Sequence, residues 1–515
     1  MNENSTNSMN PTNLISGRLL AQNTLLNLVG KVVPLLIGVV TLPFIVRGLG
    51  TERFGLLSLA WVVLGYFAIF DLGMGRATTK YVSEALGNGE EDHVPRLVWT
   101  TVTIQAILGL LGALILTGIT PLLVERVLNI PSTLIGEAKT TFYLLALSIP
   151  VVLVSSSFSG VLEARQRFDL VNAVRVPSSI STYLLTLIGL FIGFQLPGIV
   201  ALILAARFAA LVAFVIINLR IAPQLKKYSG SFALFPRLFS YGGWITVSSV
   251  VGPVLVYLDR FLIASLLSIA AVGYYTAPYG AVTYLSIIPG SLVMSLFPAF
   301  SALERMRDRQ RLGTLFARSV KYTLLILTPI VLILILFAEE ILQIWLGSDF
   351  ALQSKMVMKI LALGVLVNSL ANVPYVLLQG TGRPDITAKF HLLELPIHIW
   401  IVWVLVNHWG ITGAAAAWTL RMALDALLLF VAAFKVCRLL PRLLAINGVT
   451  LASFALLLLT VMAYGVKDLA GAFSLFAQSL LFVALFGLFA WAVWQKVMDT
   501  SDRNTILRMV KLWQK

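Results

Sequence analysis

Two stretches of this sequence, Gly160–Leu170 (GVLEARQRFDL) and Val376–Ile386 (VLLQGTGRPDI), match each other at an offset of 216 residues. Apolar residues fall on apolar residues throughout the match. The polar positions coincide as well: Glu163 with Gln379, Arg167 with Arg383 and Asp169 with Asp385. A match that includes polar residues is a better sign of an internal repeat than shared leucines alone.

Two further matches fall at nearly the same offset. Phe44–Ala60 aligns with Leu262–Pro278 at an offset of 218, which places Gly55 on Gly273. Gly198 aligns with Gly413 at an offset of 215. Three matches at one spacing predict two similar halves, as in transporters built from a parallel repeat with the binding site between the halves.

The composition requires a lipid environment. The chain has 515 residues, of which 58% are hydrophobic and 12% charged, and its mean hydropathy is +0.91. Soluble domains carry about 25% charged residues, so this chain is expected to be an integral membrane protein. Its net charge of +15 does not indicate nucleic-acid binding, because the basic residues lie in the segments between apolar stretches, where they orient membrane proteins.

Apolar segments of about 20 residues predict about fourteen membrane spans. They are 22–46, 54–73, 97–120, 140–162, 170–193, 198–219, 239–258, 272–299, 320–337, 355–379, 386–406, 411–434, 443–465 and 473–495. The expected fold is an all-α integral membrane protein with two six-helix bundles related by a parallel repeat and two additional C-terminal helices. The expected domains are residues 1–219, a cytoplasmic linker at 220–238, residues 239–434, and residues 435–515 with a basic cytoplasmic tail.

The distribution of basic residues predicts the orientation. With the N-terminus in the cytoplasm, the inside segments hold about 27 Lys and Arg residues and the outside segments about 7. An even number of spans then places both termini in the cytoplasm.

Four charged residues are expected near the middle of the membrane: Lys31, Arg207, Glu394 and Arg421. Arg207 and Arg421 occupy nearly equivalent positions in the two halves, and Asp425 lies one helical turn beyond Arg421. Charges at this depth normally face a cavity or a partner. Because the planar fork of arginine suits phosphate, we predict a cationic chamber in which Arg207, Arg421 and Lys31 bind an anionic ligand.

Other interpretations of these residues stay open at this point. Arg421 and Asp425 are also explained by a structural ion pair, and Lys31 by a side chain that extends to the cytoplasmic surface. Glu394 and Asp425 are candidates for coupling to a proton or sodium ion, whereas Glu394 is equally explained as the counter-charge of an arginine.

Pro34 and Pro253 fall within one residue of equivalence in the repeat. Each removes a backbone hydrogen bond and bends its helix, so the pair predicts either gating helices or ordinary kinks. Two polar clusters at predicted helix ends contain acid–arginine pairs, Asp71 with Arg76 after the second span and Asp259 with Arg260 after the seventh.

The sequence lacks the signs of an enzyme. The four histidines and single cysteine are too scattered for a metal site, and no P-loop is present. Outside segments are too short to hold an acceptor and catalytic groups. We therefore expect no enzymatic activity, no metal and no cofactor, apart from a coupling proton or sodium ion.

Several motifs resemble a known family. The step after the first span (Leu49, Gly50, Phe54, Gly55), Asp71-Leu72-Gly73, and Asp259-Arg260 followed by Gly273-Tyr274 are similar to those of Wzx-type polysaccharide biosynthesis flippases. These belong to the multidrug/oligosaccharidyl-lipid/polysaccharide exporter superfamily. The resemblance covers the whole chain in span number and repeat, and its specific motifs lie in the first 90 residues and around 259–279.

The resemblance implies a flippase of the bacterial inner membrane that moves a polyprenyl-pyrophosphate-linked oligosaccharide from the inner to the outer leaflet. Alternating access would be driven by an ion gradient, in O-antigen, capsule or exopolysaccharide synthesis. Possible partners are the polysaccharide polymerase and glycosyltransferases. The alternatives are a cation-coupled drug antiporter or a lipid II flippase of the same superfamily, and a non-transporting scaffold of a polysaccharide assembly complex.

Overall fold

The computed structural model describes residues 17–66, 68–469, 475–500 and 502–503, and all regular elements in them are helices. Eleven of these helices are long and apolar enough to cross a membrane. Two of the eleven, α1 and α14, each contain two segments separated by a glycine with a positive φ, Gly50 (75°) and Gly410 (56°). Counting these segments separately and adding the 32-residue helix α8 gives a number of long helices in the described residues that fits the expected fourteen spans. The all-α membrane fold is thereby confirmed.

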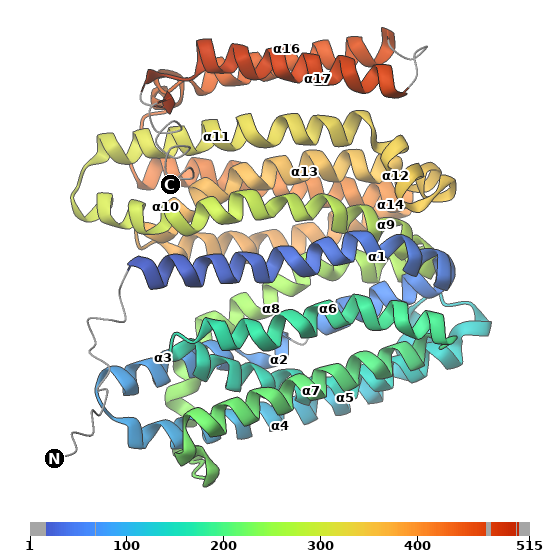
Figure 1. Ribbon diagram of the computed structural model, residues 1–515, viewed down its shortest axis with the longest axis vertical. Coiled ribbons are helices and arrows are strands. Elements are labelled where there is room, and N and C mark those ends of the chain that lie inside the picture. Colours follow the sequence, from blue (N-terminus) through green and yellow to red (C-terminus); the bar gives the residue numbers. More distant parts are fainter. Residues whose placement is uncertain (1–16, 67, 470–474, 501, 504–515) are drawn as a thin grey trace, which may run out of the picture. The chain divides into compact units, whose positions relative to one another are not determined.

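The described residues up to 276 form one compact unit, and those from 277 onward form a second. The helices of the first unit are α1 (Gly17–Tyr66), α2 (Ala68–Asp71), α3 (Met74–Gly87), α4 (Val94–Leu122), α5 (Ile135–Ala164), α6 (Phe168–Ile192), α7 (Leu196–Ile221) and α8 (Phe235–Leu266). Helix α9 (Ile269–Thr283) crosses the boundary. In the first unit α4, α5, α6 and α7 run side by side (Figure 1).

The second unit contains the later helices of the second repeat and the two additional helices, whereas α8 and the start of α9 belong to the first unit. Its helices are α10 (Ile287–Arg305), α11 (Arg309–Leu336), α12 (Ala338–Leu346), α13 (Ser348–Gly380), α14 (Pro384–Val436), α15 (Arg442–Ile446), α16 (Val449–Leu469) and α17 (Leu475–Ala492). Helices α16 and α17 pack on α11 through an apolar cluster that includes Leu332, Leu456 and Phe482. The domain boundaries expected from the sequence stay a prediction, and most of the basic tail, residues 504–515, lies outside the described residues.

The repeat appears in the backbone at matching turns. Left-handed φ values recur at offsets of 216 to 218 residues: Gly89 (75°) with Arg307 (56°), Gln166 (58°) with Gly382 (78°), and Gly193 (85°) with Gly410 (56°). Such values are costly for residues other than glycine, so their recurrence at Gln166 and Arg307 reflects a turn that the fold imposes. The parallel repeat predicted from the sequence is confirmed.

The stretches that first indicated the repeat form the same local structure. Arg167 precedes α6 and its Nε donates to Asp169 Oδ1 at 2.9 Å. Arg383 precedes α14 and its Nε donates to Asp385 Oδ1 at 3.1 Å. In each case the carboxylate lies in the first turn of the helix, where it interacts favourably with the helix dipole.

Gly55 and Gly273, which are equivalent in the repeat, also pack against each other within the first unit. A Cβ atom on Gly55 would lie 1.9 Å from the carbonyl oxygen of Ile269, and one on Gly273 would lie 3.2 Å from that of Thr51. Helices α1 and α9 therefore approach closely enough to exclude any side chain at Gly55.

One expected helix end is confirmed and one is corrected. Helix α2 ends at Asp71, as expected, and α3 adds 14 residues after a short turn; Figure 1 shows α2 and α3 continuing toward the end of the unit where α4 begins. Asp259 and Arg260 do not follow a helix but lie inside α8. Their polar side chains are buried, which lowers the local hydropathy and ends the predicted span too early.

Candidate functional site

A polar pocket of about 210 Å³ lies between α5, α6 and α7 in the first unit. Its lining combines two arginines with hydroxyl groups: Arg175, Arg207, Ser155, Ser178, Ser179 and Thr182, together with Val152, Ala210 and Phe214. Pockets for drug-sized ligands usually measure about 300–1,000 Å³. This one therefore suits a compact polar group more than a whole oligosaccharide.

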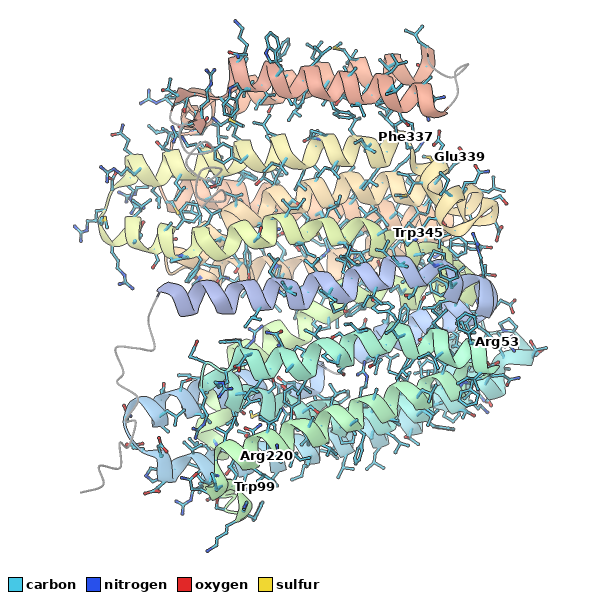
Figure 2. All side chains as sticks on the ribbon, viewed as in Figure 1. Arg53, Trp99, Arg220, Phe337, Glu339 and Trp345 are labelled. Atoms are coloured by element: carbon cyan, nitrogen blue, oxygen red, sulfur yellow. The ribbon has the colours of Figure 1, made fainter. Side chains whose placement is uncertain are left out.

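Arg207 lies near the middle of α7. It precedes Arg220, at the cytoplasmic end expected for this helix, by 13 residues, or about 20 Å of helix. Figure 2 shows Arg220 and Trp99 at one end of the first unit and Arg53 at the other. Arg207 therefore lies away from both ends of its helix, which agrees with the predicted position near the middle of the membrane.

Arg207 has no counter-charge within the described residues. Its side chain is partly buried, and no charged group there acts on it. It also lines a small crevice with Trp61, whose indole Nε1–H is buried and has no acceptor among the described residues. A guanidinium inside a membrane helix bundle without a carboxylate is costly, so the pocket is suited to an anion that enters from outside.

Arg175 is held differently, because its charge is compensated. Its Nη2 donates to Glu163 Oε1 at 2.9 Å and to Ser159 Oγ at 2.8 Å. The pocket therefore contains one compensated and one uncompensated guanidinium. The hydroxyls of the pocket follow a local pattern in which Ser155 Oγ donates to Val151 O at 2.7 Å, which leaves its lone pairs available to a ligand.

A second polar cluster lies within α14 of the second unit. The helix turns at Gly410, so Glu394 on the first arm faces Arg421 and Asp425 on the second. Arg421 Nη1 lies 3.9 Å from Glu394 Oε2, and Glu394, Arg421 and Asp425 are 1%, 9% and 9% exposed. The carboxyl groups of Glu394 and Asp425 interact with each other across the turn, and no other side chain donates a hydrogen bond to the Glu394 oxygens among the described residues.

Two histidines extend this cluster along the first arm. His391 interacts electrostatically with Asp425 and Arg421, and His398 is 1% exposed. The close approach of the two arms depends on Gly413, where a Cβ atom would lie 1.9 Å from the carbonyl oxygen of Leu405.

The ion pair of Arg421 is formed with Glu394. This agrees with the interpretation of Glu394 as the counter-charge of an arginine.

The remaining predicted residues lie apart from these two clusters. Lys31 is exposed on α1 and forms no ion pair within the described part of the chain. Pro34 lies inside α1 and Pro253 inside α8. Their role in gating stays a prediction.

The geometry of the Asp259–Arg260 ion pair indicates a structural role. Arg260 Nη1 donates to Asp259 Oδ1 at 2.9 Å, and the side chains are 3% and 2% exposed. Tyr275 donates a hydrogen bond to the other oxygen of Asp259. The guanidinium also lies 5.6 Å from the ring centres of Tyr257 and Tyr275, so both charges are satisfied within the first unit.

Asp71 is also held by neighbouring helices. Gln105 Nε2 on α4 donates to Asp71 Oδ1 at 2.5 Å, and Ser156 Oγ on α5 does so at 3.4 Å. Arg76, its expected partner, is exposed. The cluster therefore links the end of α2 to α4 and α5, and Arg76 acts on Asp71 through its charge, not through a close ion pair.

Sequence reasoning missed the residues that surround the two arginines: Arg175, Ser178, Thr182, His391 and His398. The repeat could have found them, because 175, 178 and 182 correspond to 391, 394 and 398 at the offset of 216. No group of His, Cys, Asp and Glu side chains that could hold a metal ion occurs in the ranges that the structure describes.

Comparison with known proteins agrees with this architecture. Residues 20–304 match the polysaccharide biosynthesis protein family, and residues 245–404 match the MatE family. A Shigella flexneri protein named "Putative O-antigen transporter" is 30% identical over 79% of this chain and 96% of its own length. The succinoglycan biosynthesis transport protein ExoT of Rhizobium meliloti is 25% identical over 73% of this chain and 70% of its own.

Solved structures show the same fold. The lipid II flippase MurJ in an inward closed conformation aligns with a TM-score of 0.70 at 13% identity, over 92% of this chain and 99% of MurJ. An inward-facing multidrug transporter of the MATE family aligns with a TM-score of 0.68 at 14% identity, over 81% of this chain and 94% of its own.

The fold and the buried charges define a multi-pass membrane protein with the architecture of the exporter superfamily. Because the family match covers more than half of the sequence, the chain belongs to the polysaccharide biosynthesis protein family. Several of its relatives are named as transporters or flippases.

Proposed function

We propose that this chain is a flippase that moves a polyprenyl-pyrophosphate-linked oligosaccharide from the inner to the outer leaflet of the bacterial inner membrane. It acts by alternating access in the synthesis of O-antigen, capsule or exopolysaccharide. Family membership and the transport functions named for its relatives support this proposal. The chain itself carries out no catalysis.

One observation of this structure carries the proposal: an arginine without a counter-charge among the described residues lies within spanning helices, in a pocket lined with hydroxyl groups. The guanidinium of Arg207 can donate two parallel hydrogen bonds to a phosphate oxygen pair. The hydroxyls of Ser178 and Thr182 can bond phosphate or sugar oxygens. A drug antiporter for cations would require the opposite charge.

Lys31 and Arg421 are further candidates for contact with the headgroup, and Glu394 and Asp425 for coupling to a proton or sodium gradient. Pro34 and Pro253 are candidate bending points during the conformational change. The excess of basic residues in the inside segments supports a cytoplasmic location for both termini. Glycosyltransferases that complete the lipid-linked substrate and a polymerase that consumes it are the proposed partners.

The test is complementation of a strain that lacks its own flippase and makes no surface polysaccharide. The wild-type chain should restore the polysaccharide, and Arg207→Ala should not, at equal amounts of protein in the membrane. Arg220→Ala, an exposed arginine on the same helix, is the matched control and should restore it fully. Full restoration by Arg207→Ala would contradict the proposed binding site, and a wild type without transport in reconstituted vesicles would favour the scaffold alternative.

A further inference from the structure

Equivalent positions of the repeat carry opposite chemistry in the two halves. Helix α6 begins at residue 168 and α14 at residue 384, which is the offset of 216. Arg175, Ser178 and Thr182 on α6 therefore correspond to His391, Glu394 and His398 on the first arm of α14. The facing helix carries Arg207 in the first half and Arg421 in the second.

The first half presents a net positive charge at these positions. Arg175 is compensated by Glu163, while Arg207 has no charged partner among the described residues. The groups added by α6 are hydroxyls, which bond an anion without repelling it. An anionic ligand would make this pocket neutral.

The second half presents one excess negative charge when its acids are ionised. Among the acids and the arginine, Arg421 contributes one positive charge, whereas Glu394 and Asp425 contribute two negative charges. Helices packed on α14 add no uncompensated charge. Helix α9 has no charged residue, and the charged residues of α13 all lie between 349 and 359, far from its junction with α14. Helix α11, which contacts α14 through Phe316, carries four basic residues, and each of them is paired with an acid: Arg309 with Glu304, Arg311 with Asp308, Arg318 with Asp499 and Lys321 with Asp502. One proton makes the cluster neutral.

We infer that the two halves divide the work of transport, so that the pyrophosphate anion binds at Arg207 in the first half while Arg421 is held by Glu394 and Asp425 in a one-proton site. This inference rests on the proposed function and revises it, because it removes Arg421 from the substrate contacts. Loss of the proton leaves a net negative charge in a dry helix hairpin, which burial disfavours. Proton binding and release therefore change the stability of this hairpin.

The geometry favours a proton over a sodium ion. A sodium ion in a protein needs several oxygen ligands, whereas the two acids here face a guanidinium 3.9 Å from Glu394 and the imidazole of His391. The carboxyl groups of Glu394 and Asp425 interact with each other, so one proton can lie between them without further ligands. Coupled acids of this kind titrate together as a pair.

The first experiment measures binding of a sugar-free polyprenyl pyrophosphate to the purified full-length chain in nanodiscs. Arg207→Gln should weaken binding by at least about tenfold, the size of a lost charge-assisted bidentate contact, and Arg421→Gln by less than about threefold. The exposed residues Arg220 and Lys435 supply charge-matched controls as Arg220→Gln and Lys435→Gln. Equal losses for Arg207→Gln and Arg421→Gln would overturn the division of work.

A second variant distinguishes a lost substrate contact from misfolding. This control is needed because Arg421→Gln leaves Glu394 without its counter-charge. The double variant Arg421→Gln/Glu394→Gln removes one charge of each sign and should bind the probe as tightly as the wild type. If it binds as weakly as Arg207→Gln, Arg421 contacts the substrate and the inference is wrong.

The third experiment identifies the ion in proteoliposomes that contain a lipid-linked oligosaccharide. An imposed proton gradient should accelerate flipping by the wild type but not by Glu394→Gln, which keeps the size of the side chain and removes its titration. Acceleration by a sodium gradient alone would refute the one-proton site. A wild type that flips no oligosaccharide under any gradient would refute the proposed function, whereas flipping with the wrong ion would leave that function standing.

Discussion

At the scale of single residues, the surroundings of Arg207 determine its role. A lysine at this position would keep the charge but lose the planar fork that binds two phosphate oxygens. We therefore expect Arg207→Lys to retain only part of the flipping activity, with a loss of about tenfold, between wild type and Arg207→Ala. The measurement is the rate of flipping in proteoliposomes at matched protein density, and a fully active Arg207→Lys would show that charge alone is sufficient.

A second prediction concerns Asp502, which attaches the segment after α17 to α11. Lys321 and Tyr322 both donate hydrogen bonds to its carboxylate, and the side chains of Lys321 and Asp502 are 1% and 0% exposed. Removing one partner of a buried pair typically costs about 3–5 kcal/mol. Asp502→Asn should therefore lower the thermal unfolding midpoint in detergent, and the double variant Lys321→Met/Asp502→Leu should recover most of the loss. An unchanged midpoint for Asp502→Asn would contradict this.

The same contact predicts a response to acid. Burial raises the pKa of Asp502, but the hydrogen bonds from Lys321 and Tyr322 outweigh burial, so the pKa of this carboxyl lies below its usual value. Its contribution to stability is complete above the unfolded pKa of about 3.9 and is lost as the pH falls through the lower folded pKa. Limited proteolysis should therefore release the C-terminal segment only below about pH 4, and release at neutral pH would be inconsistent with the pair.

At the scale of helices, the contact between α1 and α9 depends on Gly55. Because a Cβ atom there would lie 1.9 Å from Ile269 O, Gly55→Ala should force the helices apart and cost about 1–3 kcal/mol. Gly118 on α4 has no atom within 4 Å of the same position, so Gly118→Ala should leave stability unchanged or slightly raised. Thermal unfolding of the two variants in parallel tests this, and equal midpoints would refute the close contact.

The helices also show how far the sequence predicts the structure. Their number, the repeat and the mid-helix position of Arg207 were predicted, because apolar length and recurring motifs are visible in sequence. The end of the seventh span was wrong because α8 buries polar residues such as Asp259 (1% exposed). A hydropathy profile cannot distinguish polar residues that line a helix bundle from those that face water.

The site itself could be predicted only in part. Arginine within an apolar segment is a strong signal, since its cost demands an explanation. Ser178 and Thr182 gave no such signal in the sequence, because hydroxyl residues are common in membrane helices and often form hydrogen bonds with their own backbone. The contact of Glu394 with Arg421 depends on the turn at Gly410, and its direction is not encoded in the spacing of these two residues along the chain.

At the scale of the whole molecule, the proposed orientation can be tested with single cysteines. Cys437 is the only cysteine and is 1% exposed, so Cys437→Ala provides a background free of thiols. In that background Arg126→Cys should react with a membrane-impermeant maleimide in intact spheroplasts. Gln310→Cys, which is also exposed, should react only after permeabilisation. The opposite pattern would invert the proposed topology.

The two halves of this chain share a backbone pattern but differ in the charges that they bury. The first offers a positive pocket to an anion, and the second holds an arginine between two acids. A repeat that diverged in this way can bind substrate in one half and respond to an ion in the other. The two halves therefore have different buried charges, whereas the repeats of a symmetric pore would have the same ones.

The most direct measurement is the flipping of a defined polyprenyl-pyrophosphate-linked oligosaccharide by the purified chain in proteoliposomes, compared with Arg207→Ala and Arg220→Ala. The wild type and Arg220→Ala should move the substrate to the opposite leaflet at similar rates, and Arg207→Ala should remain close to protein-free vesicles. Wild-type rates for Arg207→Ala would contradict the account that its guanidinium binds the anion during transport.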